Sequence, residues 1–170
     1  MPSGPDHVRQ AEHNLQFLEL FSPSYQYNDW ALTVGFYSCV HIVEYVIGAY
    51  GKKFLYRGTE LKQKLQHSED IARAAESQGI LAPNNLRWGN RGPSHSLRNA
   101  LVKENFKEIK DDYMELYYKC RASRYEIYRC NPAEIKSYLE GAVTNIINWS
   151  NSKYGTKFKQ PILPPLLAPV

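Results

Sequence analysis

The 170-residue sequence has few cysteines, and their spacing excludes two kinds of site. Its three cysteines, Cys39, Cys120 and Cys130, are an odd number and form no C-x-x-C pair. This pattern rules out a dense disulfide scaffold and a four-cysteine zinc site, and it favours reduced thiols in the cytoplasm. Residues 1–13 contain no apolar core, so we expect no secretory signal.

Local motifs for catalysis or cofactor binding are missing as well. The sequence contains no G-x-x-x-x-G-K-[ST] phosphate loop, no G-x-G-x-x-G dinucleotide loop and no G-x-S-x-G nucleophile elbow. It also lacks H-E-x-x-H and H-x-x-x-H, in which two histidines one helical turn apart bind a metal ion. We therefore expect neither a metal site nor a cofactor.

Only one stretch, Ala31 to Tyr50, is long and apolar enough to raise the question of a membrane span. It contains His41 and, well inside the run, Glu44. A charged residue near the centre of a bilayer costs about 2.5–3.5 kcal/mol on insertion scales. The stretch is therefore interpreted as a buried helix of a helical bundle, and no membrane contact is expected.

Apolar residues recur at helical spacing along most of the chain, which predicts an all-α fold with no strand hairpin. The first helix is expected from Pro5 to Phe21, because Ser3 and Asp6 have the spacing of a capping box. The second helix is expected from Asp29 to Tyr50, and its apolar surface places it at the centre of the domain.

Two further helices are predicted in the middle part of the chain. A short one runs from Ser68, its cap, to Gln78 and ends at Gly79. A long one begins near Ser94 or Ser96 and runs to about Tyr118 or beyond. Its apolar positions have the heptad spacing of helices that pack lengthwise in bundles: Val102, Phe106, Ile109, Tyr113, Leu116 and Cys120.

The last helix has the clearest start, with Asn131 as cap and Pro132 in the first position, and it ends at Gly155. Together these helices predict an up-and-down bundle of four to five helices, with a long basic loop before the third long helix. We expect one domain over residues 1–155. The proline-rich tail, residues 156–170, is expected to be extended and either packed on the bundle, disordered or used as a docking peptide.

Positive charge is concentrated beyond residue 50. Residues 1–50 carry one basic and five acidic side chains, a charge of −4, so the remainder of the +4 chain carries +8. Two basic stretches, residues 52–64 and 84–103, interleave aromatics, including Trp88 in the second. Cations neutralise phosphates and aromatics stack on unpaired bases, so these stretches favour contact with RNA or a nucleotide. The alternative is a pair of solvated basic loops.

The histidines are the candidate titrating groups. His41 shares a helix face with Tyr37 and Glu44 and is either a site residue or a satisfied core histidine. His95 and Arg98 lie in the first turn of the third long helix, where backbone N–H groups favour anions. They are predicted to bind phosphate, unless they are only exposed cap residues. The remaining histidines are interpreted as surface residues: His7, His13 and His67.

Three segments together resemble the HEPN-type helical domains. They are the amphipathic "AEHNLQFLEL", the tryptophan-led "DWALTVGFYSCVHIVEYVI" with its Tyr-x-x-x-His, and "SHSLRNALVKENFKEIKDDYMELYYKCRASRYEIY". The last contains His95 with Arg98 in a His-x-x-Arg step, Tyr113 with Leu116, and a closing Arg124–Tyr125. The resemblance covers about residues 6–150. It implies a bundle that is commonly dimeric and is linked to RNA cleavage, nucleotide binding or partnership with a nucleotidyltransferase.

Many HEPN members place Arg before His, with four to six residues between them, to cleave RNA without a metal. Here Arg91 and His95, like Arg9 and His13, have three residues between them. Arg87 and His95 have seven, so the strict signature is absent. We therefore expect a domain without standard catalysis that binds nucleotide, RNA or a partner protein. The expected ligand-binding residues are Arg87, Trp88, Arg91, Arg124 and Tyr125.

Two other functions stay open. One is a metal-independent ribonuclease of toxin or defence type that uses His95, Arg98 and His41. The other is a dimerising structural subunit, with a face supplied by the tyrosines at the end of the third long helix: Tyr113, Tyr117, Tyr118, Tyr125 and Tyr128.

Overall fold

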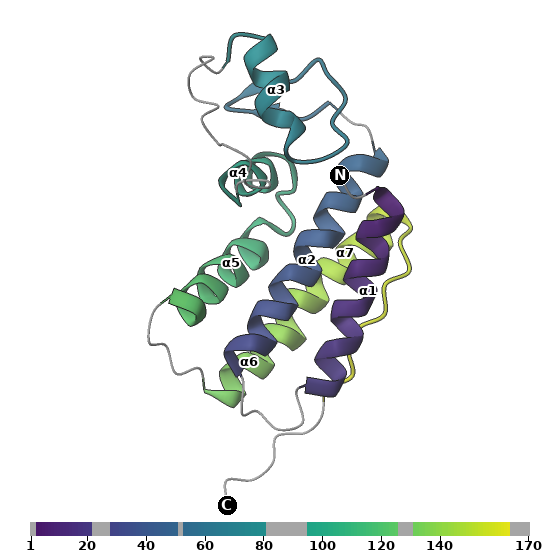
Figure 1. Cartoon of the computed structure of the whole chain (residues 1–170), viewed down its shortest axis with the longest axis vertical. Helices are drawn as coiled ribbons and strands as arrows, with labels where there is room; N and C mark the ends of the chain where they lie inside the picture. The colour runs from purple at the N-terminus through teal and green to yellow at the C-terminus, as the bar shows by residue number, and fades with distance from the viewer. Residues whose placement is uncertain (1–2, 22–27, 51–52, 81–94, 126–130, 164–170) are drawn as a thin grey trace, which may run out of the picture.

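The protein is an all-α bundle arranged around one central helix. The computed structural model describes residues 3–21, 28–50, 53–80, 95–125 and 131–163. Helix α2 (Asn28–Tyr50) runs along the long axis of the molecule (Figure 1), with α1 (Gly4–Phe21) on one side and α5 (Lys110–Tyr125) on the other. Helix α7 (Thr144–Tyr154) also contacts α2. The predicted fold class is therefore confirmed.

The first two helices form as the sequence predicts. The backbone N–H and the hydroxyl of Ser3 both donate to Asp6 Oδ2 over 2.7 Å, which is one half of the predicted capping box; the Asp6 N–H donates to the Ser3 carbonyl and not to its hydroxyl. Helix α2 is long and apolar enough to cross a membrane, but 72% of its most apolar window is buried inside the bundle. Such burial is typical of the core helix of a soluble protein.

The prediction of one continuous third long helix is wrong. The segment forms two helices, α4 (His95–Asn105) and α5, joined by a turn at residues 106–109. The Asn105 side chain bonds to both the N–H and the C=O of Leu55, so the end of α4 is held by the neighbouring hairpin. All six heptad residues are nevertheless buried, because the turn keeps Phe106 and Ile109 in the core. The spacing predicted the apolar face and missed the break.

The predicted absence of a strand hairpin is also wrong. Strands β1 (Leu55–Tyr56) and β2 (Thr59–Glu60) pair antiparallel across a turn at Arg57 and Gly58, both of which have positive φ. Arginine is uncommon in this backbone region, so the sequence gives a weak turn signal. The Glu104 carboxylate accepts the backbone N–H groups of both turn residues, at 2.9 and 3.0 Å, which stabilises the turn.

The short helix after the hairpin, α3 (Asp70–Ser77), starts later than predicted. Its cap is Glu69, and the Ser68 side chain instead bonds to Glu44 on α2. Gly79, which has a φ of 71°, follows the end of the helix as predicted. Ser68 is thus a tertiary contact and not a helix cap.

The last helical segment starts at the predicted residue and ends where expected. Asn131 Oδ1 accepts from the N–H of Ala133 over 2.9 Å, which caps α6 (Pro132–Tyr138). The helix continues through a π-helical turn, η3 (Leu139–Val143), into α7. Gly155 adopts a left-handed conformation, with a φ of 66°, and ends it.

The described part of the proline-rich tail packs on the bundle. Residues 155–163 run extended beside α1 (Figure 1). Phe158 is buried, and the side chain of Asn151 bonds to both its N–H and its C=O. Further along, the Ile162 N–H donates to Glu19 on α1 over 3.1 Å. Residues 164–170 of the predicted tail lie outside the described residues.

Candidate functional site

Two opposite charges lie in the core between α2 and α4. Glu44 and Arg98 are each 3% exposed, and Arg98 Nε donates to Glu44 Oε1 over 2.5 Å. Removing ions from water costs several kcal/mol per ion, so a buried pair needs further hydrogen bonds to be tolerated. Arg98 is therefore engaged inside the protein and does not present its charge to solvent.

Ser68 supplies the remaining hydrogen bonds to the Glu44 carboxylate. Its backbone N–H donates to Glu44 Oε2 over 3.0 Å, and its hydroxyl donates to Oε1. Burial alone would raise the pKa of Glu44, but the Arg98 charge and the Ser68 hydrogen bonds hold that pKa below its ordinary value. Glu44 is therefore ionised at neutral pH.

Gly48 allows the segment carrying Ser68 to lie against α2. A Cβ at position 48 would be 2.7 Å from the backbone oxygen of Gln66, closer than real side chains come. The Asp70 carboxylate accepts the N–H groups of Gln66 and His67, at 2.9 and 3.1 Å, and so fixes the same segment. This close approach brings His67 and Ser68 beside Glu44.

Three histidines from distant parts of the chain form a row beside this ion pair. His7 Nδ1 lies 3.0 Å from His41 Nδ1, and His7 Nε2 lies 3.3 Å from His67 Nδ1. His7 is buried, while His41 and His67 are half-buried. The prediction of a surface residue is therefore wrong for His7, because the buried face of α1 is wider than its apolar stripe; His13 is exposed as predicted.

The middle of this row is uncharged at neutral pH. Burial is the main cause that lowers the pKa of His7; the Glu44 charge opposes this shift, and the Arg98 charge adds to it. Burial, with a contribution from the Arg98 charge, lowers the pKa of His41 to about 4. In each nitrogen–nitrogen contact one ring must donate and the other accept, as neutral imidazoles can.

His95 lies at the start of α4, in an aromatic environment. Its ring centroid is 5.8 Å from that of Phe36 and 5.9 Å from those of Tyr37 and Tyr117. Tyr37 Oη lies 3.4 Å from His95 Nε2, and Arg98 Nη1 lies 3.4 Å from its Nδ1. Burial lowers the pKa of His95, with the nearby arginine charges contributing. His95 is thus half-buried and is not an exposed cap residue.

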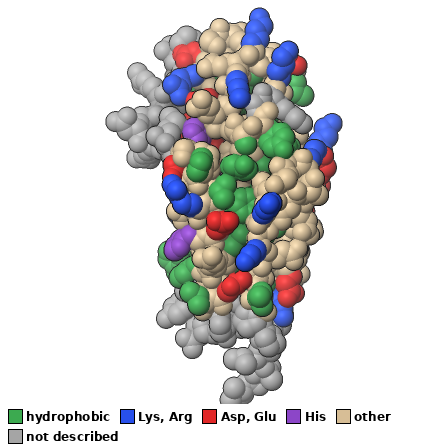
Figure 2. All heavy atoms as spheres, turned by 90° about the vertical axis from the view of Figure 1, so that its right-hand side faces the viewer, with side chains coloured by type: hydrophobic (Ala, Val, Ile, Leu, Met, Phe, Trp, Pro, Cys, Tyr) green, Lys and Arg blue, Asp and Glu red, His purple; other side chains and the backbone are tan. Residues whose placement is uncertain are grey.

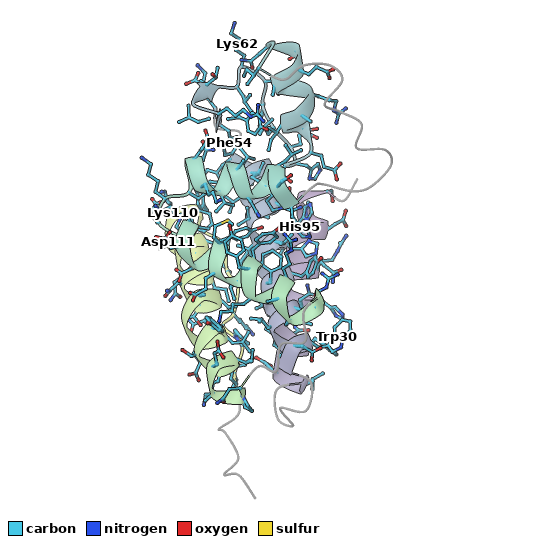
Figure 3. All side chains as sticks on the ribbon, turned by 90° about the vertical axis from the view of Figure 1, so that its left-hand side faces the viewer. Trp30, Phe54, Lys62, His95, Lys110 and Asp111 are labelled. Carbon is cyan, nitrogen blue, oxygen red and sulfur yellow. The ribbon has the colours of Figure 1, made fainter. Side chains whose placement is uncertain are left out.

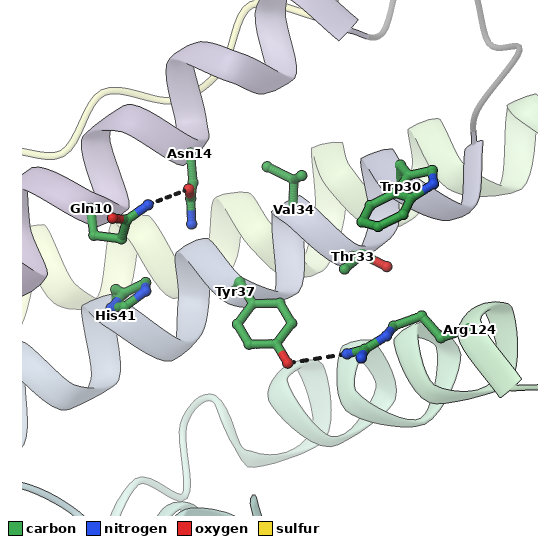
Figure 4. Close-up of a pocket in the computed structure, with 8 residues that line it drawn as sticks. All are labelled: Gln10, Asn14, Trp30, Thr33, Val34, Tyr37, His41 and Arg124. Atoms are coloured by element: carbon green, nitrogen blue, oxygen red, sulfur yellow. Dashed lines mark hydrogen bonds between the residues drawn. The ribbon is translucent and has the colours of Figure 1, made fainter. Parts of the chain in front are cut away.

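A pocket of about 380 Å³ opens where α1, α2 and α5 meet. Figure 4 shows Tyr37 and His41 on α2, with the Tyr37 ring turned toward Arg124 of α5. Arg124 Nη1 donates to Tyr37 Oη over 3.1 Å. The remaining lining residues are polar amides of α1 and further α2 residues: Gln10, Asn14, Trp30, Thr33 and Val34.

Trp30 is the most exposed aromatic residue of this pocket. Its side chain is 57% exposed, in the first turn of α2. Gln10 Nε2 donates to Asn14 Oδ1 over 2.9 Å, which aligns two amide groups along the α1 side of the pocket. The pocket therefore combines an exposed indole, a guanidinium, a phenol, an imidazole and two amides.

No protein-family model, curated protein or solved structure compared with this chain matches it. The resemblance to HEPN domains therefore stays a prediction based on the motif residues.

The structure brings some of the predicted site residues together. His41 and Arg124 line one pocket, and Tyr37 connects that pocket to His95. Arg98 is close to His95, as predicted, but its guanidinium is buried against Glu44. Arg87, Trp88 and Arg91 lie outside the described residues, as does the Tyr125 side chain.

The described part of the first basic stretch lacks surface aromatics. Phe54 and Tyr56 are 3% and 5% exposed, so they are unavailable for stacking on bases, contrary to the interpretation of residues 52–64. The alternation that exposes Lys53 and Arg57 turns the aromatic rings into the core.

The surface charges of this stretch lie apart from the pocket: Figure 3 shows Lys62 at the hairpin end of the molecule, well away from Trp30. Acidic and basic side chains are interspersed over the face in Figure 2.

Sequence reasoning missed most of the residues that complete the site. His7, Gln10 and Asn14 share one face of α1, at three- and four-residue spacing, which was a signal for a common polar face. Trp30, Thr33, Tyr37 and His41 have the same spacing on α2. Nothing in the sequence indicated that these two faces meet.

Proposed function

We propose that the pocket between α1, α2 and α5 binds single-stranded RNA or a nucleotide. The observation that carries this proposal is the convergence of Trp30, Tyr37 and Arg124 on one pocket. A base with its phosphate needs an aromatic surface, a cation and hydrogen-bonding groups, and single-stranded recognition uses these three together.

The exposed indole of Trp30 is the expected stacking surface. Stacking of a base on an aromatic side chain contributes about 1–3 kcal/mol and tolerates any base. Most of the Trp30 side chain faces solvent, whereas Trp149 is only 7% exposed and belongs to the core. Trp30 is therefore available to a ligand without rearrangement of the bundle.

Arg124 and the α1 amides would hold the rest of the ligand. A guanidinium has five N–H donors, so Arg124 can donate to Tyr37 and also contact a phosphate. The bond between Gln10 and Asn14 uses one donor and one acceptor. The other amide atoms, Gln10 Oε1 and Asn14 Nδ2, are an acceptor and a donor of the kind that base edges require.

The test measures the affinity of the full chain for a short labelled single-stranded RNA by fluorescence anisotropy. Trp30→Ala should weaken binding roughly 5- to 100-fold, the loss of one stacked base. The matched control is Tyr118→Ala, because Tyr118 is 56% exposed on α5 and does not line the pocket. Equal affinities for the Trp30→Ala and Tyr118→Ala variants would contradict the proposal.

Arg124→Gln supplies a second, electrostatic readout. Each phosphate contact to a single strand contributes about 0.7 to the slope of log K against log salt concentration. We expect this variant to bind more weakly and to have a slope smaller by about that amount. An unchanged slope would show that Arg124 does not contact phosphate.

RNA cleavage is the second candidate function, because His41 lines the same pocket as Arg124. In this reaction His41 would accept the proton of a 2′-hydroxyl. The 2′-oxygen would then attack the adjacent phosphorus to form a 2′,3′-cyclic phosphate, and the bond to the 5′-oxygen would break as that oxygen takes a proton from water. Arg124 would stabilise the charged phosphate. Cleavage in excess chelator that is lost in His41→Gln would support it, and RNA left intact by the wild-type chain would exclude it.

This proposal retains the cellular setting that the sequence suggested. The chain would act in the cytoplasm, with a nucleotidyltransferase as its class of protein partner, in a toxin–antitoxin or defence pair. A homodimer would use the end of α5, where Tyr118 is exposed, whereas Tyr113 is fully buried and belongs to the core. Sedimentation of the purified chain over a range of concentrations tests the dimer.

A further inference from the structure

The row of histidines contains a group of side chains with metal-binding atoms close together. One ligand atom from each of His7, Glu44 and His67 lies within 4.8 Å of the other two. His7 and Glu44 are 6% and 3% exposed. His67 is half-buried, so the cluster reaches from the core toward the surface.

The separation of the two imidazoles fits a metal ion. His7 Nε2 and His67 Nδ1 are 3.3 Å apart. Two nitrogen ligands at about 2.0–2.1 Å from a tetrahedral zinc ion are separated by about 3.3 Å, from the bond length and the tetrahedral angle. The two side chains therefore lie at the nitrogen–nitrogen distance that shared coordination requires.

His41 would hold the first imidazole in the tautomer that a metal needs. If His7 carries its proton on Nδ1, it donates to His41 Nδ1 over 3.0 Å and leaves the Nε2 lone pair for the metal. A hydrogen bond of this kind to the second ring nitrogen accompanies almost every metal-bound histidine. Neutral His41 then carries its own proton on Nε2, so this tautomer excludes His41 as the base for RNA cleavage.

The Glu44 carboxylate can bind a metal ion in addition to its protein partners. Its Oε1 accepts from both Arg98 and Ser68, while its Oε2 accepts one hydrogen bond, from the Ser68 N–H, among the described residues. A carboxylate oxygen has two lone pairs, so Oε2 can bind one more partner. Arg98 and Ser68 would orient this ligand, and the Arg98 charge would weaken cation binding relative to an unpaired carboxylate.

We propose that His7 Nε2, His67 Nδ1 and the Glu44 carboxylate bind one zinc ion, with a fourth position open to water or a ligand. Two imidazoles, one carboxylate and one open position are the ligand set of a zinc site that is not purely structural. The absence of H-E-x-x-H does not exclude this site, because its ligands come from α1, α2 and the segment before α3. The expectation of no metal site came from local spacing alone.

The test measures zinc binding to the full chain, after removal of metal by chelator, through equilibrium dialysis and metal analysis. The wild-type chain should bind one zinc ion, and His67→Gln should bind at least about tenfold more weakly. His13→Gln is the matched control, because His13 is an exposed histidine of α1 outside the cluster. Zinc should raise the melting temperature of the wild type and the control more than that of His67→Gln.

A second measurement uses only the wild-type chain and so does not depend on the variant folding. In NMR spectra of the imidazole nitrogens, zinc should shift His7 Nε2 and His67 Nδ1 and leave His13 unchanged. The proposal is wrong if zinc does not bind, if His67→Gln binds as tightly as His13→Gln, or if only His13 shifts. None of these outcomes depends on RNA binding, so this site and the proposed function are tested separately.

Discussion

The buried ion pair between Glu44 and Arg98 is expected to affect the stability of the bundle strongly when one partner is removed. Arg98→Met should destabilise the protein by about 3–5 kcal/mol, because it leaves the Glu44 charge buried without its partner. Urea unfolding followed by circular dichroism measures this change. The double variant Glu44→Gln/Arg98→Met should lose less stability than Arg98→Met alone, since no unpaired charge remains. A loss below about 1 kcal/mol for Arg98→Met would contradict the buried ion pair.

The buried phenol of Tyr154 is expected to make the stability of the protein depend on pH in the alkaline range. Burial, with a contribution from the Glu108 charge, raises the pKa of Tyr154 to about 12. Unfolded tyrosines ionise near pH 10, so the unfolded state releases this proton first. The stability that the neutral Tyr154 phenol contributes is therefore present below pH 10 and is lost as pH rises from about 10 to 12. Melting temperatures across this range should fall less steeply for Tyr154→Phe than for the wild type; equal slopes would refute the assignment.

At the scale of elements, the Asn131 side chain is expected to stabilise the start of α6 at Pro132. Asn131→Ala removes the side-chain acceptor of the Ala133 N–H and should cost about 1 kcal/mol of unfolding free energy. Ser137→Ala is the matched control, because Ser137 is exposed within the same helix. Its effect should stay within about 0.5 kcal/mol. Equal effects in the two variants would show that the cap contributes nothing.

Gly48 tests the contact between α2 and the segment that carries His67. Gly48→Ala should destabilise the protein and weaken zinc binding, because its Cβ would push the Gln66 backbone away from α2. Gly141→Ala is the control: no atom lies within 4 Å of a Cβ there, and alanine favours the helix by up to about 1 kcal/mol. If Gly48→Ala were as stable as Gly141→Ala, the close approach would not be needed.

Local signals predicted the elements better than their contacts. The helix starts at Ser3 and Asn131 could be predicted, because a cap involves only residues three positions apart or fewer. The break between α4 and α5 could not, because Asn105 is held by Leu55, 50 residues away. Likewise, His7 meets His41 and His67 only through the packing of α1 on α2, which leaves no trace in local spacing.

At the scale of the whole molecule, the described basic residues of the hairpin do not coincide with the candidate pocket, whose cation is Arg124 of α5. The described lysines and arginines of residues 53–64 lie at the hairpin end, whereas the pocket lies between α1, α2 and α5 (Figure 3). The ligand class expected from the charge pattern therefore stays a prediction, and the described part of the first basic stretch lies apart from the pocket. Net positive charge beyond residue 50 would still attract RNA over distances set by the salt concentration.

Photocrosslinking of a 4-thiouridine RNA to the full chain, followed by mass spectrometry of the crosslinked peptides, tests the proposed function most directly. We predict that the principal crosslinks fall at Trp30 or Tyr37 and that an unlabelled nucleotide or RNA competes for them. Crosslinks confined to residues 53–64 or 84–98, with none at Trp30 or Tyr37, would contradict the assignment of this pocket.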